Sequence, residues 1–154
     1  MRLACFTPLP PAKTGVASYA AALLPRLAGR CAVEAFTTER DPDSPAIREL
    51  VPVFHAFRFP ERAEGYDAVL YEMGNSSAHR LVFESLLRYP GVVQLHDLVL
   101  HHFYLDYYYH SGRALDYARK ARAAEGRLGA TVARGVKHHL GGSFSYFELP
   151  LRAE

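Results

Sequence analysis

The sequence predicts an α/β fold in which a parallel sheet is flanked by helices and followed by a helical carboxyl-terminal half. Short apolar runs of strand length alternate with segments of helical periodicity. These runs contain few polar residues, as expected for parallel strands that are covered on both faces. The chain has 154 residues, of which 49% are hydrophobic and 22% charged. This composition and length fit one globular domain over residues 1–154.

The first predicted strand is the apolar run Leu3–Phe6, which ends at a proline-rich turn over residues 7–11. Thr14 is in position to cap the following helix. Apolar residues recur along that helix at the spacing of one helical face, namely Val16, Tyr19, Ala20, Leu23, Leu24 and Leu27. We expect Pro25 to bend this helix and Gly29 to end it.

Four further strands are predicted along the chain. Ala32–Thr37 is the second strand, and Val51–Phe54 is a weaker third strand that Pro52 assigns to an edge of the sheet. Ala68–Tyr71 is the fourth strand, and Val92–Leu95 reads as the most clearly buried one.

A helix is expected between the fourth and fifth strands. Ser76 or Ser77 can cap it, and Pro90 with Gly91 ends it. From Leu98 onward the pattern is helical, with an aromatic stretch over residues 103–109 and glycines that predict breaks between two or three helices.

Composition argues against several classes of protein. No apolar run approaches the ~20 residues that cross a bilayer, so we expect a soluble, cytoplasmic chain. Cys5 and Cys31 are too few for a disulfide framework or a zinc site and are interpreted as buried thiols. The net charge of +2 gives no reason to expect a nucleic-acid partner.

The basic residues are unevenly distributed. Residues 113–137 hold seven Lys or Arg and only two acidic residues. Such a segment can contact an anionic membrane surface or a phosphorylated acceptor, or it can be a solvated helix face.

Polar residues follow three of the predicted strands. Thr14 and Gly15 begin the first helix, Asn75 follows the fourth strand, and His96 with Asp97 follows the fifth. Because ligands collect at the carboxyl ends of parallel strands, we expect these residues to form one site. Structural roles remain open, since Gly15 can simply make a tight turn and Asp97 can cap the next helix.

A metal-dependent hydrolase is an alternative. His96, Asp97 and His101 are ligand types for zinc, manganese or iron, and His102 and the pair His138-His139 lie nearby in the sequence. Adjacent histidines on a helix point to different faces, which counts against this arrangement.

Several linked motifs together resemble the amino-terminal half of a bacterial family 4 glycosyltransferase. The likeness extends over nearly all of the chain; the matching segments are FTPLPP at 6–11, TGVASY at 14–19, Leu24-Pro25, YEMGN at 71–75 and VQLHD at 93–97. The resemblance implies the GT-B architecture, with two Rossmann-like domains facing a cleft, and sugar transfer from a nucleotide-sugar with retention of configuration.

The resemblance also implies roles for individual residues. Thr14-Gly15 matches the glycine-containing loop near donor phosphate and acceptor, and His96 matches a histidine near the transferred sugar. Asn75 matches a polar position of the cleft, and Asp97 is assigned to substrate binding with it. Neither a metal nor another cofactor is expected, because the nucleotide-sugar is a substrate.

The nucleotide-binding domain of such enzymes, which carries a pair of glutamates, has no counterpart before Glu154. The sequence thus predicts an acceptor-side domain that is inactive alone and acts on a sugar or lipid-linked acceptor beside that second domain. A non-catalytic binding or oligomerisation module derived from the same fold is the alternative.

Self-association is a further expectation. Aromatic residues are concentrated in the carboxyl-terminal half, at Phe103, Tyr104, Tyr107, Tyr108, Tyr109, Phe144, Tyr146 and Phe147. An exposed patch of this kind predicts a symmetric dimer, with the basic segment 113–137 at its rim.

Overall fold

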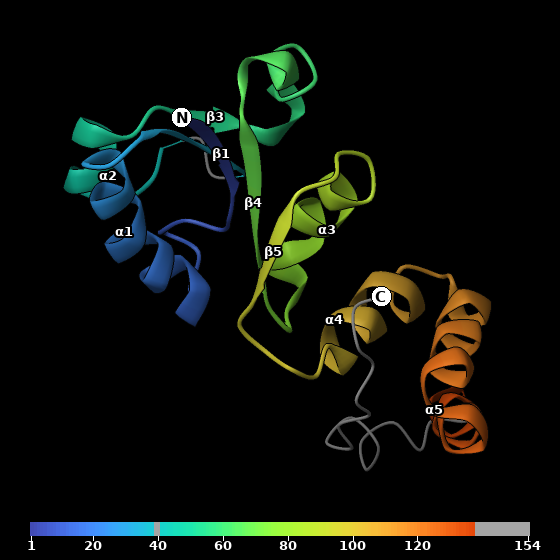
Figure 1. Cartoon of the computed structure of the whole chain (residues 1–154). Helices are drawn as coiled ribbons and strands as arrows, with labels where there is room; N and C mark the ends of the chain where they lie inside the picture. The colour runs from blue at the N-terminus through green and yellow to red at the C-terminus, as the bar shows by residue number, and fades with distance from the viewer. Residues whose placement is uncertain (39–40, 138–154) are drawn as a thin grey trace. The chain divides into compact units, whose positions relative to one another are not determined.

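The computed structural model describes residues 1–38 and 41–137 (Figure 1). They form two compact units. Of the described residues, the first comprises 1–38, 41–73 and 78–96, and the second comprises 74–77 and 97–137.

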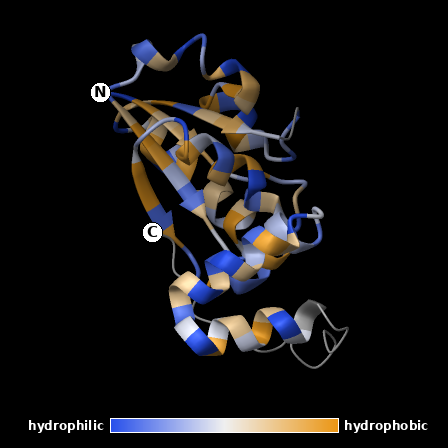
Figure 2. Cartoon of the chain, turned by 90° about the vertical axis from the view of Figure 1, so that its right-hand side faces the viewer, coloured by the Kyte–Doolittle hydropathy of each residue, from blue (hydrophilic) through white to orange (hydrophobic). Residues whose placement is uncertain are grey.

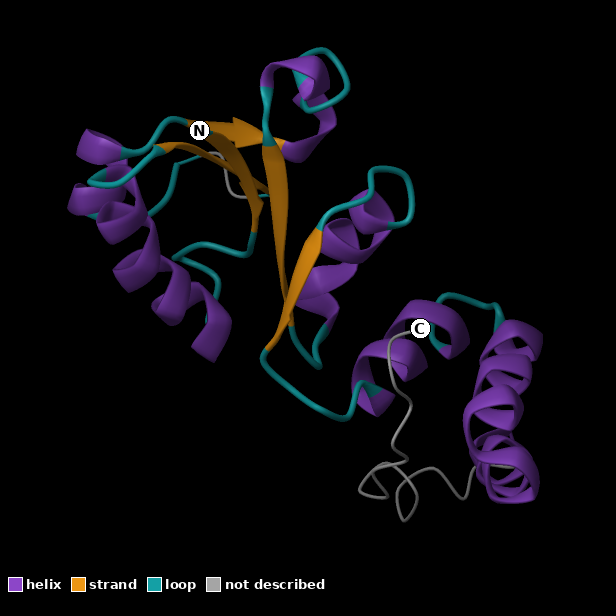
Figure 3. Ribbon diagram, in the orientation of Figure 1, coloured by secondary structure: helices purple, strands orange, loops and turns teal. Residues whose placement is uncertain are grey.

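The first unit is a five-stranded, entirely parallel sheet with the order β3-β2-β1-β4-β5 (Figure 3). The strands are β1 (Arg2–Phe6), β2 (Ala32–Thr37), β3 (Val53–His55), β4 (Ala68–Met73) and β5 (Val92–Leu95). The predicted α/β class with a parallel sheet and flanking helices is therefore confirmed, as is the edge position of the third strand.

Alternate residues of β1 divide the core of this unit between the two faces of the sheet. Leu3 and Cys5 pack with Leu24 of α1 (Gly15–Ala28) and Ile47 of α2 (Pro45–Leu50). On the other face the Phe6 ring stacks on Phe36 and Tyr71, with centroids 5.2 and 5.0 Å apart. Figure 2 shows how apolar residues concentrate in these strands.

The start and end of α1 agree with the sequence analysis. Thr14 caps the helix by accepting a hydrogen bond from the Ala17 amide at 3.0 Å, Gly29 is the C-cap, and Pro25 lies inside the last turns. The six-residue helix α2 was not anticipated, because it is too short to show helical periodicity.

The prediction that the fifth strand is the most buried one is wrong. Val92 is 64% exposed and Leu95 45% exposed. The reason is topological: among the described residues β5 pairs only with β4, so its outer side has no neighbouring strand.

The segment between β4 and β5 also differs from the expectation. A 3₁₀ turn, Ser77–His79, leads into α3 (Arg80–Leu86), whose N-cap residue is His79 and lacks a side-chain cap. The helix ends at Leu86, before Pro90 and Gly91.

The second unit is helical. It contains α4 (His101–Tyr104), which continues into a π-helical turn, Leu105–Tyr109, and then α5 (Ala114–Lys137). Gly126 has a φ of +56° and breaks α5, in agreement with the helix breaks predicted at glycines. The Arg113 guanidinium lies over the rings of Tyr107 and Tyr108, 4.4 and 4.9 Å from their centroids.

The aromatic patch invoked for a dimer is mostly internal to this unit. Phe103, Tyr104 and Tyr107 are buried, and Tyr108 and Tyr109 are half-buried. The remaining members, Phe144, Tyr146 and Phe147, lie outside the described residues, as do His138 and His139. Self-association therefore stays a prediction, without an exposed aromatic face among residues 103–109 to support it.

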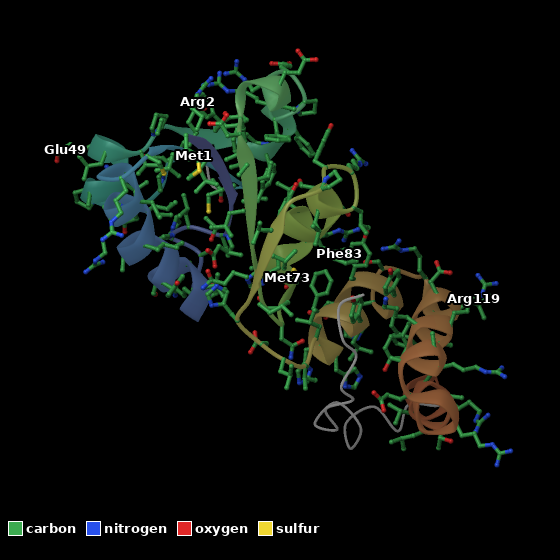
Figure 4. All side chains as sticks on the ribbon, in the orientation of Figure 1. Met1, Arg2, Glu49, Met73, Phe83 and Arg119 are labelled. Carbon is green, nitrogen blue, oxygen red and sulfur yellow. The ribbon has the colours of Figure 1, made fainter. Side chains whose placement is uncertain are left out.

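Several cations of α5 face solvent. Arg119, Arg122, Arg127 and Arg134 are exposed, and the side chain of Arg119 projects from the helix in Figure 4. Among residues 1–38 and 41–137, no helix is long and apolar enough to cross a membrane.

Gly91 gives a test of the β4–β5 packing. A Cβ atom at this position would lie 2.5 Å from the Val69 carbonyl oxygen and 2.8 Å from the Tyr71 ring. We expect Gly91→Ala to lower the free energy of unfolding by about 2 kcal/mol, because a backbone oxygen cannot move aside easily. Urea unfolding measures this.

The matched control is Gly29→Ala, since a Cβ there meets only the Arg26 carbonyl oxygen at an ordinary 3.6 Å. It should stay within about 0.5 kcal/mol of the parent chain. Equal losses in both variants would contradict the packing described for Gly91.

Candidate functional site

The candidate site lies at the carboxyl edge of the sheet in the first unit, where α1 begins and where β4 and β5 end. Parallel strands place their carboxyl ends at one edge, which is where ligands bind in open α/β sheets. Two of the segments predicted from sequence, Thr14-Gly15 and His96, belong to this edge. The structure adds Glu72, Tyr19 and Gln94.

Glu72 has no role of its own in the sequence analysis, because the residue directly follows the predicted end of the fourth strand. The fourth strand extends to Met73, two residues beyond its predicted end, so Glu72 lies within β4. Its side chain is 0% exposed. Its Oε2 atom forms a short hydrogen bond with Nε2 of His96, and its Oε1 atom has no hydrogen-bond partner among the described residues.

Strand register explains why these two residues meet. Glu72 pairs with Gln94 across the β4–β5 ladder, and the His96 amide donates to the Met73 carbonyl at 2.8 Å. Because successive side chains of a strand point to opposite faces of the sheet, Gln94 and His96, two residues apart, lie on the same face as Glu72. A diagonal pair of this kind lies within reach of long side chains.

Burial raises the pKa of the Glu72 carboxyl, and the interaction with His96 partly offsets this effect. The Cys5 thiol lies on the neighbouring strand β1. Its pKa is raised by burial and, to a smaller extent, by the Glu72 charge. Cys5 is therefore a buried thiol, as expected from its apolar neighbours.

The amino-terminal part of α1 reaches His96 through Tyr19, the fifth residue of the helix. The Tyr19 ring meets the His96 ring edge-on, with centroids 4.8 Å apart, and its hydroxyl accepts a hydrogen bond from Gln94 Nε2 at 2.9 Å. Gly15 lies four residues before Tyr19 and so shares its face of the helix. The structure thus brings Gly15 and His96 to the same edge of the sheet.

Gly15 is open to solvent. A Cβ atom there would meet nothing within 4 Å, and its φ is not in the left-handed region. Neither packing nor backbone conformation therefore requires a glycine at this position. In the first turn of α1 the Ala17 amide donates to the Thr14 side chain and the Ser18 amide to the Thr14 carbonyl, which leaves the amides of Gly15 and Val16 to hold an oxygen atom of a ligand at the positive end of the helix dipole.

Asn75 and Asp97 belong to the second unit, where they bond to each other. The Asn75 amide donates to Asp97 Oδ2 at 2.7 Å, and Asn75 Oδ1 accepts from the Phe103 amide at 2.9 Å. Asp97 does not cap α4, whose N-cap is Leu100. These bonds hold two segments of the second unit together, and a substrate contact by either residue stays a prediction.

The residues of the metal-hydrolase alternative have other partners. His96 bonds to Glu72, Asp97 bonds to Asn75, and His101 Nε2 lies 2.9 Å from the Tyr117 hydroxyl. In the part of the chain that the structure describes, no three His, Cys, Asp or Glu side chains gather as metal ligands. The structure gives this alternative no support.

In comparisons with known proteins, no family model, no curated protein and no solved structure matches the chain.

The raised pKa of Glu72 predicts a pH dependence of stability. A carboxyl whose folded-state pKa is raised binds more protons in the folded chain, so the free energy of unfolding falls as pH rises above the ordinary value of 4.5. We expect Glu72→Gln to flatten this decline. Urea unfolding between pH 4 and 7 measures the slope.

Glu49→Gln is the control, because Glu49 is exposed on α2. It should leave the slope unchanged. A Glu72→Gln chain with the parent slope would mean that the burial of this carboxyl does not affect folding.

Proposed function

We propose that the chain is the acceptor-side domain of a retaining glycosyltransferase of the GT-B type. The single observation that carries the proposal is the group at the carboxyl edge of the sheet, where a buried Glu72 holds His96 beside the first turn of α1. A histidine whose side chain is 18% exposed and a helix N-terminus that is open to solvent suit a ligand rich in hydroxyl groups and phosphate oxygens.

The proposed family comes from the linked sequence motifs, which resemble those of family 4 glycosyltransferases. In this proposal Thr14-Gly15 approaches the donor phosphate and the acceptor, and His96 contacts the transferred sugar. Asn75 and Asp97 keep a proposed contact with substrate, since the Asn75 side-chain nitrogen and Asp97 Oδ1 form no hydrogen bond within residues 1–38 and 41–137. No metal or other cofactor takes part.

The physical requirements of the reaction assign one wall of the cleft to the edge of the sheet that carries Thr14-Gly15 and His96. Retaining transfer needs the leaving diphosphate stabilised and the acceptor hydroxyl held on the same side of the sugar. The diphosphate belongs to the nucleotide-sugar, which a second domain binds in this proposal. The exposed arginines of α5 are then available to an anionic or lipid-linked acceptor near a membrane surface.

Binding of a simple acceptor analogue tests the proposal. Methyl glycosides of glucose, galactose and mannose are titrated into the ¹⁵N-labelled chain, and backbone amide shifts are followed. We expect shifts at Gly15, Tyr19 and His96 with at least one glycoside. His96→Ala should weaken that binding about tenfold, about 1.4 kcal/mol, the loss of one hydrogen bond.

His110→Ala is the matched control, because His110 is an exposed histidine that pairs with Asp106. It should bind as the parent chain does. Absence of shifts at this edge with every glycoside and with UDP-glucose would overturn the proposal. Binding without transfer after fusion to a nucleotide-sugar-binding domain would favour the non-catalytic module.

A further inference from the structure

The two ring nitrogens of His96 have different surroundings. Nε2 is engaged by Glu72, which is fully buried. Nδ1 has no hydrogen-bond partner among the described residues, and the side chain as a whole is 18% exposed. The histidine therefore has a protein side and an open side.

A carboxylate can only accept hydrogen bonds, so the ring nitrogen that faces it must carry a proton. A neutral imidazole has one proton, and the other nitrogen then has a lone pair. We propose that Glu72 is a positioning residue that fixes His96 as the Nε2-protonated tautomer, so that Nδ1 accepts a hydrogen bond from a ligand hydroxyl group. The ligand's identity as a sugar rests on the proposed function, whereas the tautomer is a property of this chain.

Ring orientation is constrained from a second direction. The Tyr19 ring contacts His96 edge-on, and the Gln94 amide holds the Tyr19 hydroxyl. A rotation of the imidazole would break its bond to Glu72 and leave a buried carboxylate without any partner, which is costly. The lone pair of Nδ1 is thereby held in one direction before a ligand arrives.

The titratable groups around the pair are few. Cys5 on β1 interacts with the Glu72 charge, Tyr19 on α1 contacts the imidazole, and Asp97 follows His96 with its Oδ2 bonded to the Asn75 amide. None of these is a cation. Glu72 has no arginine or lysine to share its charge in the described part of the chain, so His96 is its sole polar partner there.

The lone pair on Nδ1 of His96 determines which class of ligand can bind there. A lone pair on Nδ1 takes a proton donor, which a sugar hydroxyl supplies. A fully ionised phosphate or a carboxylate offers only acceptor oxygens, which Nδ1 would repel. His96 is thus specific for hydroxyl groups, whereas the N-terminus of α1 on the same edge takes acceptor oxygens.

The proton position is measured directly on the whole chain with ¹⁵N-labelled histidine. Long-range ¹H–¹⁵N correlation at pH 7.5 distinguishes the two neutral tautomers and the imidazolium. We expect His96 to be neutral with the proton on Nε2. A proton on Nδ1, or a charged ring, would overturn the inference. His110 is the internal reference, because its Nδ1 faces the Asp106 carboxylate at 2.8 Å and should favour the opposite tautomer.

Two variants separate positioning from bulk structure. Glu72→Gln keeps the size of the side chain but can either donate or accept, so the His96 signals should show a mixture of tautomers. Tyr19→Phe keeps the ring contact and loses only the hydroxyl, so the Nε2-protonated form should persist. A single unchanged tautomer in Glu72→Gln would show that Glu72 does not determine it.

The ligand step is tested with a methyl glycoside that binds the parent chain and with inorganic sulfate, which is fully ionised and has no proton to donate. We expect the glycoside to shift the Nδ1 resonance and to bind about tenfold more weakly to Glu72→Gln, whereas sulfate leaves Nδ1 unchanged. If the tautomer is found but no glycoside binds, the proposed function fails and the role of Glu72 stands. If a glycoside binds without that tautomer, the inference fails and the proposed function stands.

Discussion

A carboxyl group removed from water at the end of β4 is the constraint on which the rest of this edge depends. Burial of an ionised carboxyl is costly without a hydrogen-bond donor, and His96 is the donor that the fold supplies to Glu72. The pairing of Met73 with Leu95 sets the register that brings the two side chains to one face. The hydrogen bond between Glu72 and His96 thereby both stabilises the pairing of β4 with β5 and orients the imidazole ring.

This interaction also connects the sheet to its covering helix. Tyr19 connects α1 to the end of β5. Its ring contacts the His96 ring edge-on, and its hydroxyl accepts a hydrogen bond from the Gln94 side chain. The Thr14 cap fixes where that helix begins and therefore where Gly15 meets solvent. A ligand that contacts both the helix N-terminus and His96 would find the two already oriented, which lowers the entropy cost of binding.

Local patterns predicted the strands and the capped helix, because each depends on a run of residues that is contiguous in the sequence. The exposure of Val92 did not follow from its own strand, since it depends on which strand stands at the edge of the sheet. Likewise Gly15 and His96 could be assigned to one edge from topology alone. The pairing of Glu72 could not, because a polar residue at the end of an apolar run suggests a loop until the register with β5 is known.

The polar residues after β4 and β5 show how neighbouring members of one sequence motif take different structural roles. His96 and Asp97 are adjacent, yet one bonds to Glu72 in the first unit and the other to Asn75 in the second. The Glu72–His96 pair leaves Nδ1 of His96 without a partner among the described residues, whereas Asn75 also accepts a hydrogen bond from the Phe103 backbone amide. The proposed ligand contact therefore depends on the Glu72–His96 pair, and the Asn75–Asp97 pair holds together the segments that begin the helical unit.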